Sequence, residues 1–256
     1  MVQIVFSDFD GTLLHYHSDK NYFSKYELDI LKKLRQCGIK FCIVTGRSIQ
    51  FFKQFPELLE YVDYILASNG AVIYEVESEK VIYFKLIQEN SLKQIVRYAL
   101  SNKFSFVLNC LEECYRYDYD SLPSYDNFCS WHYSCEQVVL LFDNKKLKDC
   151  MNYLSTLFDV IVNNFNERIN ECVMDINCSG VSKGNSIVWL CQYLGIEKKD
   201  TVAFGDGEND LSMFEVVWKS VAVANASDKI RQISDDISLK CEDSGVFRYL
   251  EDNILK

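Results

Sequence analysis

The chain alternates short apolar runs with amphipathic stretches. It opens on the apolar run 2–7, which predicts a strand buried on both faces. A capping box at Ser24 and Glu27, followed by apolar residues at helical spacing, predicts a helix that ends at Gly38. Two more strands are expected at 40–44 and 64–67, with a helix between them at 48–55. This β-α-β-α-β order predicts a parallel sheet with right-handed crossovers.

The pattern changes after residue 70. Two strand-like runs, 71–74 and 81–85, flank a polar tetrapeptide and predict a hairpin. We expect residues 83–181 to form an inserted α+β domain, and 1–82 with 182–256 to form the surrounding core. Within the insertion, strands are expected at 104–108, 138–142 and 173–176. Helices are expected there at 91–100 and 145–157.

The β/α alternation returns at residue 183. The elements expected there are helices over 183–194, from about 209 and over 246–250, and strands over 201–204 and 220–223. The predicted fold class is therefore α/β: a doubly wound parallel sheet with an inserted α+β domain.

Composition is ordinary for a folded chain, with 48% apolar and 25% charged residues among 256. No run approaches the roughly 20 apolar residues that span a bilayer. Asp8 and Asp10 interrupt the first apolar run, so no signal peptide is expected and a cytoplasmic location is predicted. The eleven cysteines contain no C-x-x-C spacing and lie mostly in apolar contexts, which favours buried free thiols over disulfides or zinc.

The formal net charge of -10 disfavours non-specific binding to nucleic acid or to anionic membranes. It also means that a site for an anionic ligand must be made locally positive, which points to a bound cation.

Candidate chemistry lies where the predicted strands end. Ligands bind at the carboxyl ends of the strands in open parallel sheets. Asp8 and Asp10 follow the first strand, and Asp206 and Asp210 follow the strand after residue 200. Four carboxylates brought together would raise one another's pKa values, and a hard divalent cation relieves that repulsion. The sequence therefore predicts that Asp8, Asp10, Asp206 and Asp210 hold Mg²⁺.

Asp8 is the expected nucleophile, because a carboxylate can attack phosphorus and form an aspartyl-phosphate. Asp10 lies two residues further on and can serve as general acid and then as general base. The groups expected to hold the phosphoryl oxygens are the backbone amides of Phe9 and Gly46, the Thr45 hydroxyl and the Lys183 ammonium.

These segments resemble the motifs of the haloacid dehalogenase superfamily, and within it those of the Cof-like phosphatases. The resemblance covers essentially the whole chain. It rests on Asp-Phe-Asp-Gly-Thr-Leu-Leu at 8–14, Val-Thr-Gly-Arg at 44–47, Ser-Asn-Gly-Ala at 68–71, Gly-Val-Ser-Lys-Gly at 180–184, Gly-Asp-Gly-Glu-Asn-Asp at 205–210, and the segments 222–226 and 244–246.

The resemblance implies a phosphatase with a cap domain that acts on a small phosphorylated metabolite such as a sugar phosphate. It implies that Asp8, the Asp10 carbonyl and Asp206 bind magnesium, with Asp210 acting largely through water. The residues it places near the phosphate are Thr45, Gly46, Lys183 and Asn209. Asn69, which lies in a matching motif, is also expected to bind substrate or phosphate. A monomer or weak homodimer is expected. Ala224 departs from the family, whose members usually have glycine there, and a small effect on the local turn is expected.

The roles of several further residues stay open. Arg47 either pairs with a carboxylate or lines the substrate entrance and contacts phosphate. His15 and His17 are expected to be loop residues near the site rather than metal ligands. The aromatic segment 115–133 is expected to be mostly core, and it is also the best candidate for substrate specificity.

Other functions of the same scaffold are a phosphomutase and a catalytically silent phosphate-binding module. A dehalogenase fits the sequence poorly, because its chemistry does not need Asp10. A phospho-receiver domain also fits poorly, because its acidic residues would be adjacent in the sequence and it would need no inserted domain.

Overall fold

The computed structural model describes residues 1–14, 23–129, 133–168 and 170–256. These residues divide into two compact units, Met1–Ile82 with Ser182–Lys256 (unit 1) and Tyr83–Val181 (unit 2). His15 and His17 lie outside the described residues. No described helix is both long enough and apolar enough to cross a membrane.

Unit 1 contains a sheet that, within the described residues, has eight strands in the order β13-β12-β11-β1-β2-β3-β4-β5. Six of these strands, from β13 to β3, run parallel, and β4 pairs antiparallel with β3. The bounds are β1 Ile4–Ser7, β2 Lys40–Val44, β3 Tyr64–Ala67, β4 Val72–Glu75, β5 Lys80–Phe84, β11 Thr201–Gly205, β12 Lys219–Ala222 and β13 Asp236–Ile237. The predicted parallel sheet is confirmed, with the predicted hairpin as its antiparallel extension.

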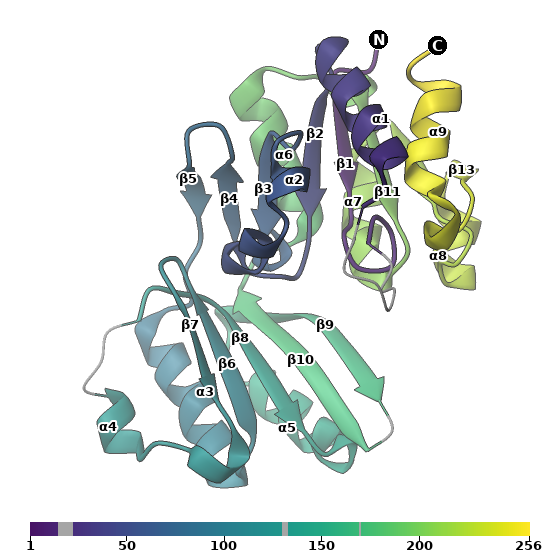
Figure 1. Cartoon of the computed structure of the whole chain (residues 1–256). Helices are drawn as coiled ribbons and strands as arrows, with labels where there is room; N and C mark the ends of the chain where they lie inside the picture. The colour runs from purple at the N-terminus through teal and green to yellow at the C-terminus, as the bar shows by residue number, and fades with distance from the viewer. Residues whose placement is uncertain (15–22, 130–132, 169) are drawn as a thin grey trace. The chain divides into compact units, whose positions relative to one another are not determined.

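Helices cover both faces of this sheet, as the apolar strands require. Every residue of β1, β3 and β11 is buried. Figure 1 shows α1 and α9 in front of the sheet and α6 behind it. The helices are α1 Lys25–Gln36, α2 Pro56–Leu59, α6 Lys183–Leu194, α7 Leu211–Val216, α8 Asp228–Ile233 and α9 Gly245–Asn253. Strands that are apolar on both faces therefore lie between two helical layers.

The predicted helix over 48–55 is a 3-10 segment, η1 Ile49–Gln54, followed by the separate α2. Pro56 begins α2, and proline disfavours the helical conformation at the residue before it. Phe51, Phe52 and Phe55 from this segment pack around the ring of Phe9. The ring of Phe9 is therefore part of the core, although its backbone directly follows Asp8.

Unit 2 contains an antiparallel sheet that, within the described residues, has five strands in the order β7-β6-β8-β10-β9. Its apolar core joins alternate residues of β6, β8 and β10 to α3 and α5. The bounds are α3 Glu89–Asn102, β6 Ser105–Cys110, β7 Cys114–Tyr117, α4 Tyr125–Cys129, β8 Cys135–Phe142, α5 Leu147–Leu154, β9 Val160–Arg168 and β10 Glu171–Cys178.

The two edge strands of this sheet, β7 and β9, were not predicted. Strand β7 is only four residues long, and β9 is rich in asparagine and lacks apolar alternation. An edge strand is hydrogen-bonded on one side only, so its residues carry a weaker apolar signal. In the aromatic segment, Phe128 is buried, while Tyr115, Tyr117, Tyr125 and Tyr133 pack half-buried against the core. Its possible role in specificity stays a prediction.

The ten cysteines whose side chains the structure describes are free thiols, and seven of them are buried. Burial raises the pKa of the Cys42 thiol well above its usual value, and the nearby Asp63 raises it further. These thiols therefore behave as small apolar side chains, as predicted.

The predicted capping box begins α1. The Ser24 hydroxyl accepts the Glu27 amide, and Glu27 accepts the Ser24 amide at 2.7 Å. The other Glu27 oxygen accepts the Ser244 hydroxyl at 2.8 Å, immediately before α9. A buried carboxylate therefore links the starts of two helices.

We predict that Ser24→Ala lowers the free energy of unfolding by about 1 kcal/mol, the usual value of an N-cap. Glu27→Ala should cost about 2–3 kcal/mol, because it also leaves Ser244 without its acceptor. Urea unfolding of both variants measures this difference, with exposed Asp29→Ala as the control. Equal losses for Ser24→Ala and Glu27→Ala would show that the Ser244 contact contributes nothing.

Candidate active site

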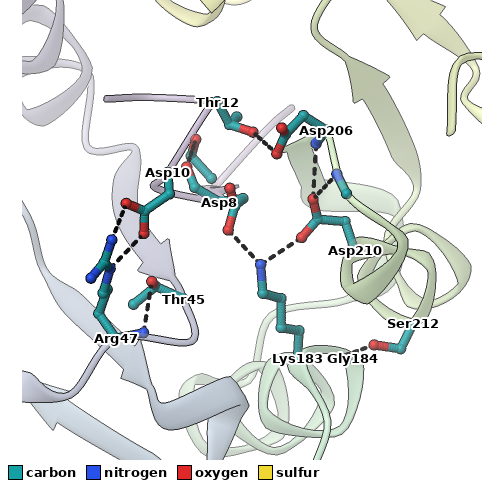
Figure 2. A network of polar contacts seen from close by, with 12 residues as sticks. Asp8, Asp10, Thr12, Thr45, Arg47, Lys183, Gly184, Asp206, Asp210 and Ser212 are labelled. Carbon is teal, nitrogen blue, oxygen red and sulfur yellow. Dashed lines mark hydrogen bonds and ion pairs between the residues drawn. The ribbon is translucent and has the colours of Figure 1, made fainter. Parts of the chain in front are cut away.

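The site lies in unit 1 at the carboxyl ends of β1, β2 and β11. Asp8 follows β1, Thr45 follows β2 and Asp206 follows β11. Strands β11 and β2 are the two neighbours of β1 in the sheet, so residues almost 200 positions apart meet there. Figure 2 shows the resulting network of polar contacts.

Lys183 lies at the centre of this network and begins helix α6. Its Nζ donates to Asp8 Oδ1 at 2.5 Å and to Asp210 Oδ1 at 2.6 Å. Lys183 is 1% exposed, Asp8 6% and Asp210 0%. An ammonium this deeply buried is tolerated only because two carboxylates surround it.

Asp210 is oriented by both of its oxygens. While Oδ1 accepts Lys183, Oδ2 accepts the backbone amides of Asp206 at 2.8 Å and Gly207 at 3.0 Å. Gly205 makes this possible, because a Cβ there would lie 2.5 Å from Asp210 Oδ2. Asp210 therefore shapes the loop after β11 and positions Lys183.

Asp206 faces Asp8 from the neighbouring strand. Its Oδ1 accepts the Thr12 hydroxyl at 3.0 Å. Gly11, directly before Thr12, has a left-handed backbone with φ +82°. A Cβ at Gly11 would lie 2.6 Å from Asp206 Oδ2. Thr12 was quoted in the first motif, but no role was predicted for it.

The electrostatics show an excess of negative charge. Burial raises the pKa of Asp8 well above its usual value; Lys183 opposes this rise, and Asp210 and Asp206 add to it. Burial likewise raises the pKa of Asp206, and Asp210 raises it further. Burial alone would lower the pKa of Lys183, but Asp210 and Asp8 outweigh burial and raise it. Lys183 therefore stays protonated, and three carboxylates share one ammonium.

The donor set fits a hard divalent cation. Asp8, Asp206 and Asp210 each offer an oxygen, and these oxygens lie within 4.8 Å of one another. Oxygen ligands of octahedral Mg²⁺, about 2.1 Å from the metal, lie about 3–4 Å apart, so a small contraction suffices. Because both Asp210 oxygens already accept hydrogen bonds, Asp8 and Asp206 are the better direct ligands and Asp210 suits a contact through water.

Asp10 lies on the side of Asp8 that faces β2, away from Asp206 and Asp210 (Figure 2). Its carboxylate accepts two hydrogen bonds from Arg47, at 2.9 Å from Nε and 2.8 Å from Nη2. Of the two interpretations of Arg47, the structure shows the pairing with a carboxylate. The role of Arg47 in phosphate binding stays a prediction.

The loop after β2 is tied to the segment after β3. The Thr45 hydroxyl accepts the Arg47 amide at 3.1 Å, and the Thr45 carbonyl accepts the Asn69 amide at 2.8 Å. Asn69 is buried with φ 59°, a conformation that asparagine tolerates. Gly46 and Asn209 are half-buried in the loops after β2 and β11. The phosphate contacts predicted for Phe9, Thr45, Gly46, Asn69 and Asn209 stay predictions.

Asn225 completes the loop that carries Asp8 and Asp10, and no role was predicted for it. Its Nδ2 donates to the Gly11 carbonyl at 2.8 Å, and its Oδ1 accepts the Cys241 amide at 2.8 Å. The signal was present in the segment 222–226, which resembles a family signature. Ala224 before it has no left-handed backbone, so alanine is accommodated there without strain.

The chain matches the model of the haloacid dehalogenase-like hydrolase family over residues 5–250. A Buchnera aphidicola (subsp. Baizongia pistaciae) relative with a provisional phosphatase name is 30% identical, covering 88% of each chain. The Bacillus subtilis 5-amino-6-(5-phospho-D-ribitylamino)uracil phosphatase YitU is 25% identical over 96% of this chain and 95% of its own.

Solved structures agree with this family. A phosphatase of the same superfamily from Bacteroides thetaiotaomicron superposes with a TM-score of 0.81 at 23% identity, covering 100% of this chain and 96% of its own. A Thermotoga maritima protein superposes with a TM-score of 0.76 at 26% identity, covering 98% and 97%. The chain belongs to the haloacid dehalogenase-like hydrolase family.

We predict that Lys183→Met lowers the free energy of unfolding by about 3–5 kcal/mol, because it leaves Asp8 and Asp210 as unpaired buried carboxylates. Adding Asp8→Asn to Lys183→Met should recover part of the loss by removing one of those charges. Chemical unfolding in metal-free buffer measures both variants. The exposed pair of Lys229 and Glu208 provides the control, and Lys229→Met should cost less than about 1 kcal/mol. A loss for Lys183→Met no larger than for the control contradicts the prediction.

Proposed function

We propose that the chain is a magnesium-dependent phosphatase that hydrolyses a small phosphorylated metabolite through an aspartyl-phosphate on Asp8. The observation that carries this proposal is the contact between Lys183 and Asp8, beside Asp206 and Asp210. A carboxylate held by a buried ammonium next to a divalent-cation donor set suits attack on phosphorus. The family match and the phosphatase names of two relatives support it.

In the first step, an Asp8 carboxylate oxygen attacks phosphorus and the bond from phosphorus to the leaving oxygen breaks. Asp10, in its protonated form and with only one oxygen still accepting from Arg47, gives its proton to that leaving oxygen, so the organic product departs as a neutral alcohol. Lys183 holds Asp8 in place and offsets the negative charge that gathers on the phosphoryl group. We propose that the Thr45 hydroxyl and the Gly46 amide, which follow β2, bind phosphoryl oxygens.

In the second step, water attacks the phosphorus of the aspartyl-phosphate, and the bond from phosphorus to the Asp8 oxygen breaks. Asp10, now a carboxylate, accepts the proton that the water loses. Asp8 is restored as a carboxylate and inorganic phosphate is released. A divalent cation, held by Asp8, Asp206 and the Asp10 carbonyl, supplies charge neutralisation and polarises a phosphoryl oxygen when it is bound.

We further propose that unit 2 is the substrate-specificity cap. It is inserted between Ile82 and Ser182, next to Lys183 in the sequence, and it has a core of its own. If unit 1 carries the phosphoryl-transfer chemistry and unit 2 recognises the leaving group, the same scaffold can act on many substrates. The substrate of YitU, given by its name, belongs in a test panel with sugar phosphates.

We predict that the wild-type chain releases phosphate from 4-nitrophenyl phosphate with Mg²⁺ and that Asp8→Asn lowers kcat by at least about a thousandfold. The exposed Asp29→Asn provides a matched control with unchanged activity. Circular dichroism confirms that both variants fold. If the wild type and Asp8→Asn are equally inactive across the metabolite panel, the chain is a binding module. An isomerised product without free phosphate would indicate a phosphomutase.

We predict that Asp206→Asn raises the Mg²⁺ concentration for half-maximal activity at least about tenfold, because one of the two direct carboxylate ligands loses its charge. Isothermal titration with Mg²⁺ gives the same comparison without turnover. The matched control is Asp228→Asn, an exposed aspartate on α8. An unchanged Mg²⁺ affinity in Asp206→Asn would place the cation elsewhere.

A further inference from the structure

The contact between Arg47 and Asp10 is a two-point contact. Both carboxylate oxygens of Asp10 accept from the guanidinium, at 2.9 and 2.8 Å. A paired contact of this kind restricts the direction of the carboxylate as well as its distance. Figure 2 shows the Asp10 carboxylate turned toward Arg47, while Asp8 is turned toward Lys183.

Arg47 is positioned by contacts that do not involve Asp10. Its guanidinium lies over the Phe51 ring, 4.5 Å from the centroid. Its backbone amide donates to the Thr45 hydroxyl, and its carbonyl accepts the Ser68 amide at 2.8 Å. Because packing and backbone contacts hold it, Arg47 can set the position of a partner.

The backbone of Asp10 is restrained in a similar way. The Phe9 carbonyl accepts the amides of Leu13 and Leu14, and the Leu14 carbonyl accepts the Gly11 amide at 2.9 Å. With this turn closed, the Asp10 carboxylate can change position mainly by rotating its two side-chain torsions. Arg47 limits that remaining freedom.

The pair also separates charge across the site. Asp206 and Asp210 follow β11, while Arg47 follows β2, and the order β11-β1-β2 places them on opposite sides of β1. Asp10 is 33% exposed and Arg47 43% at the side chain, so the contact lies at the open side of the site. Arg47 therefore offsets the charge that Asp10 carries as a carboxylate, which would otherwise add to the charges of Asp8, Asp206 and Asp210.

We propose that Arg47 is the positioning residue for Asp10, and that it fixes the direction of the acid–base carboxylate instead of binding the phosphoryl group itself. This inference rests on the proposed function, because it assumes that Asp10 transfers the proton. It chooses between the two interpretations that the sequence left open for Arg47.

The test uses two esters of similar shape, phenyl phosphate and 4-nitrophenyl phosphate. Phenolate is the more basic leaving group and needs a proton more than 4-nitrophenolate does. General acid catalysis contributes typically 10²–10⁴-fold, and poor positioning forfeits part of it. We expect Arg47→Met, which keeps an unbranched stem over Phe51, to lower the ratio of kcat/KM for phenyl over 4-nitrophenyl phosphate about tenfold.

The same ratio should fall in Asp10→Asn, and Arg47→Met should lower it no further in the Asp10→Asn background. Arg47→Lys restores the charge but not the two-point contact, so its ratio should lie between those of wild type and Arg47→Met. The control is Arg35→Met, an exposed arginine on α1, which should leave the ratio unchanged.

An equal loss of kcat/KM for both esters in Arg47→Met overturns the proposal and assigns Arg47 to phosphate binding. A further fall of the ratio in the double variant also overturns it. Failure of the proposed function looks different, because wild type would then cleave neither ester.

Discussion

A single buried ammonium makes the site possible. Lys183 contacts Asp8 and Asp210 at hydrogen-bonding distance, and all three side chains are almost fully buried. Without it, the carboxylates after β1 and β11 would repel one another in an environment that disfavours charge. Even with it, burial and neighbouring acids keep the pKa values of Asp8 and Asp206 raised. The remaining negative charge is of the kind that a divalent cation would neutralise, and this imbalance supports the proposal that the site holds one.

The aspartates at the four motif positions differ in their hydrogen bonds. Asp210 has both oxygens engaged by Lys183 and by backbone amides, which makes it a scaffold for the loop after β11. Asp206 is held by Thr12 and remains near Asp8. Asp10 is paired with Arg47 on the side of β2. These differences support the separate roles that we propose for four chemically identical side chains: nucleophile for Asp8, acid–base group for Asp10, metal ligand for Asp206 and support for Asp210.

Much of this organisation could be predicted from the chain. Apolar runs without alternation predicted β1, β2, β3 and β11, because strands covered on both faces need apolar residues at every position. The capping box of Ser24 and Glu27 was confirmed because its hydrogen bonds are local. The edge strands β7 and β9 were missed, since pairing on one side demands little of their residues. The helix over 48–55 was interrupted because proline and the packing around Phe9 acted against the local helical pattern.

The sequence by itself determined which residues follow the strands, since strand ends are local features, and a parallel sheet then brings those ends to one edge. It also determined the acidic excess that calls for a cation. Tertiary structure decided which atoms meet: that Lys183 bridges Asp8 and Asp210, that Arg47 takes both oxygens of Asp10, and that Asn225 braces Gly11. Such contacts join segments up to 214 residues apart, and they depend on strand order and side-chain direction, neither of which a local pattern encodes.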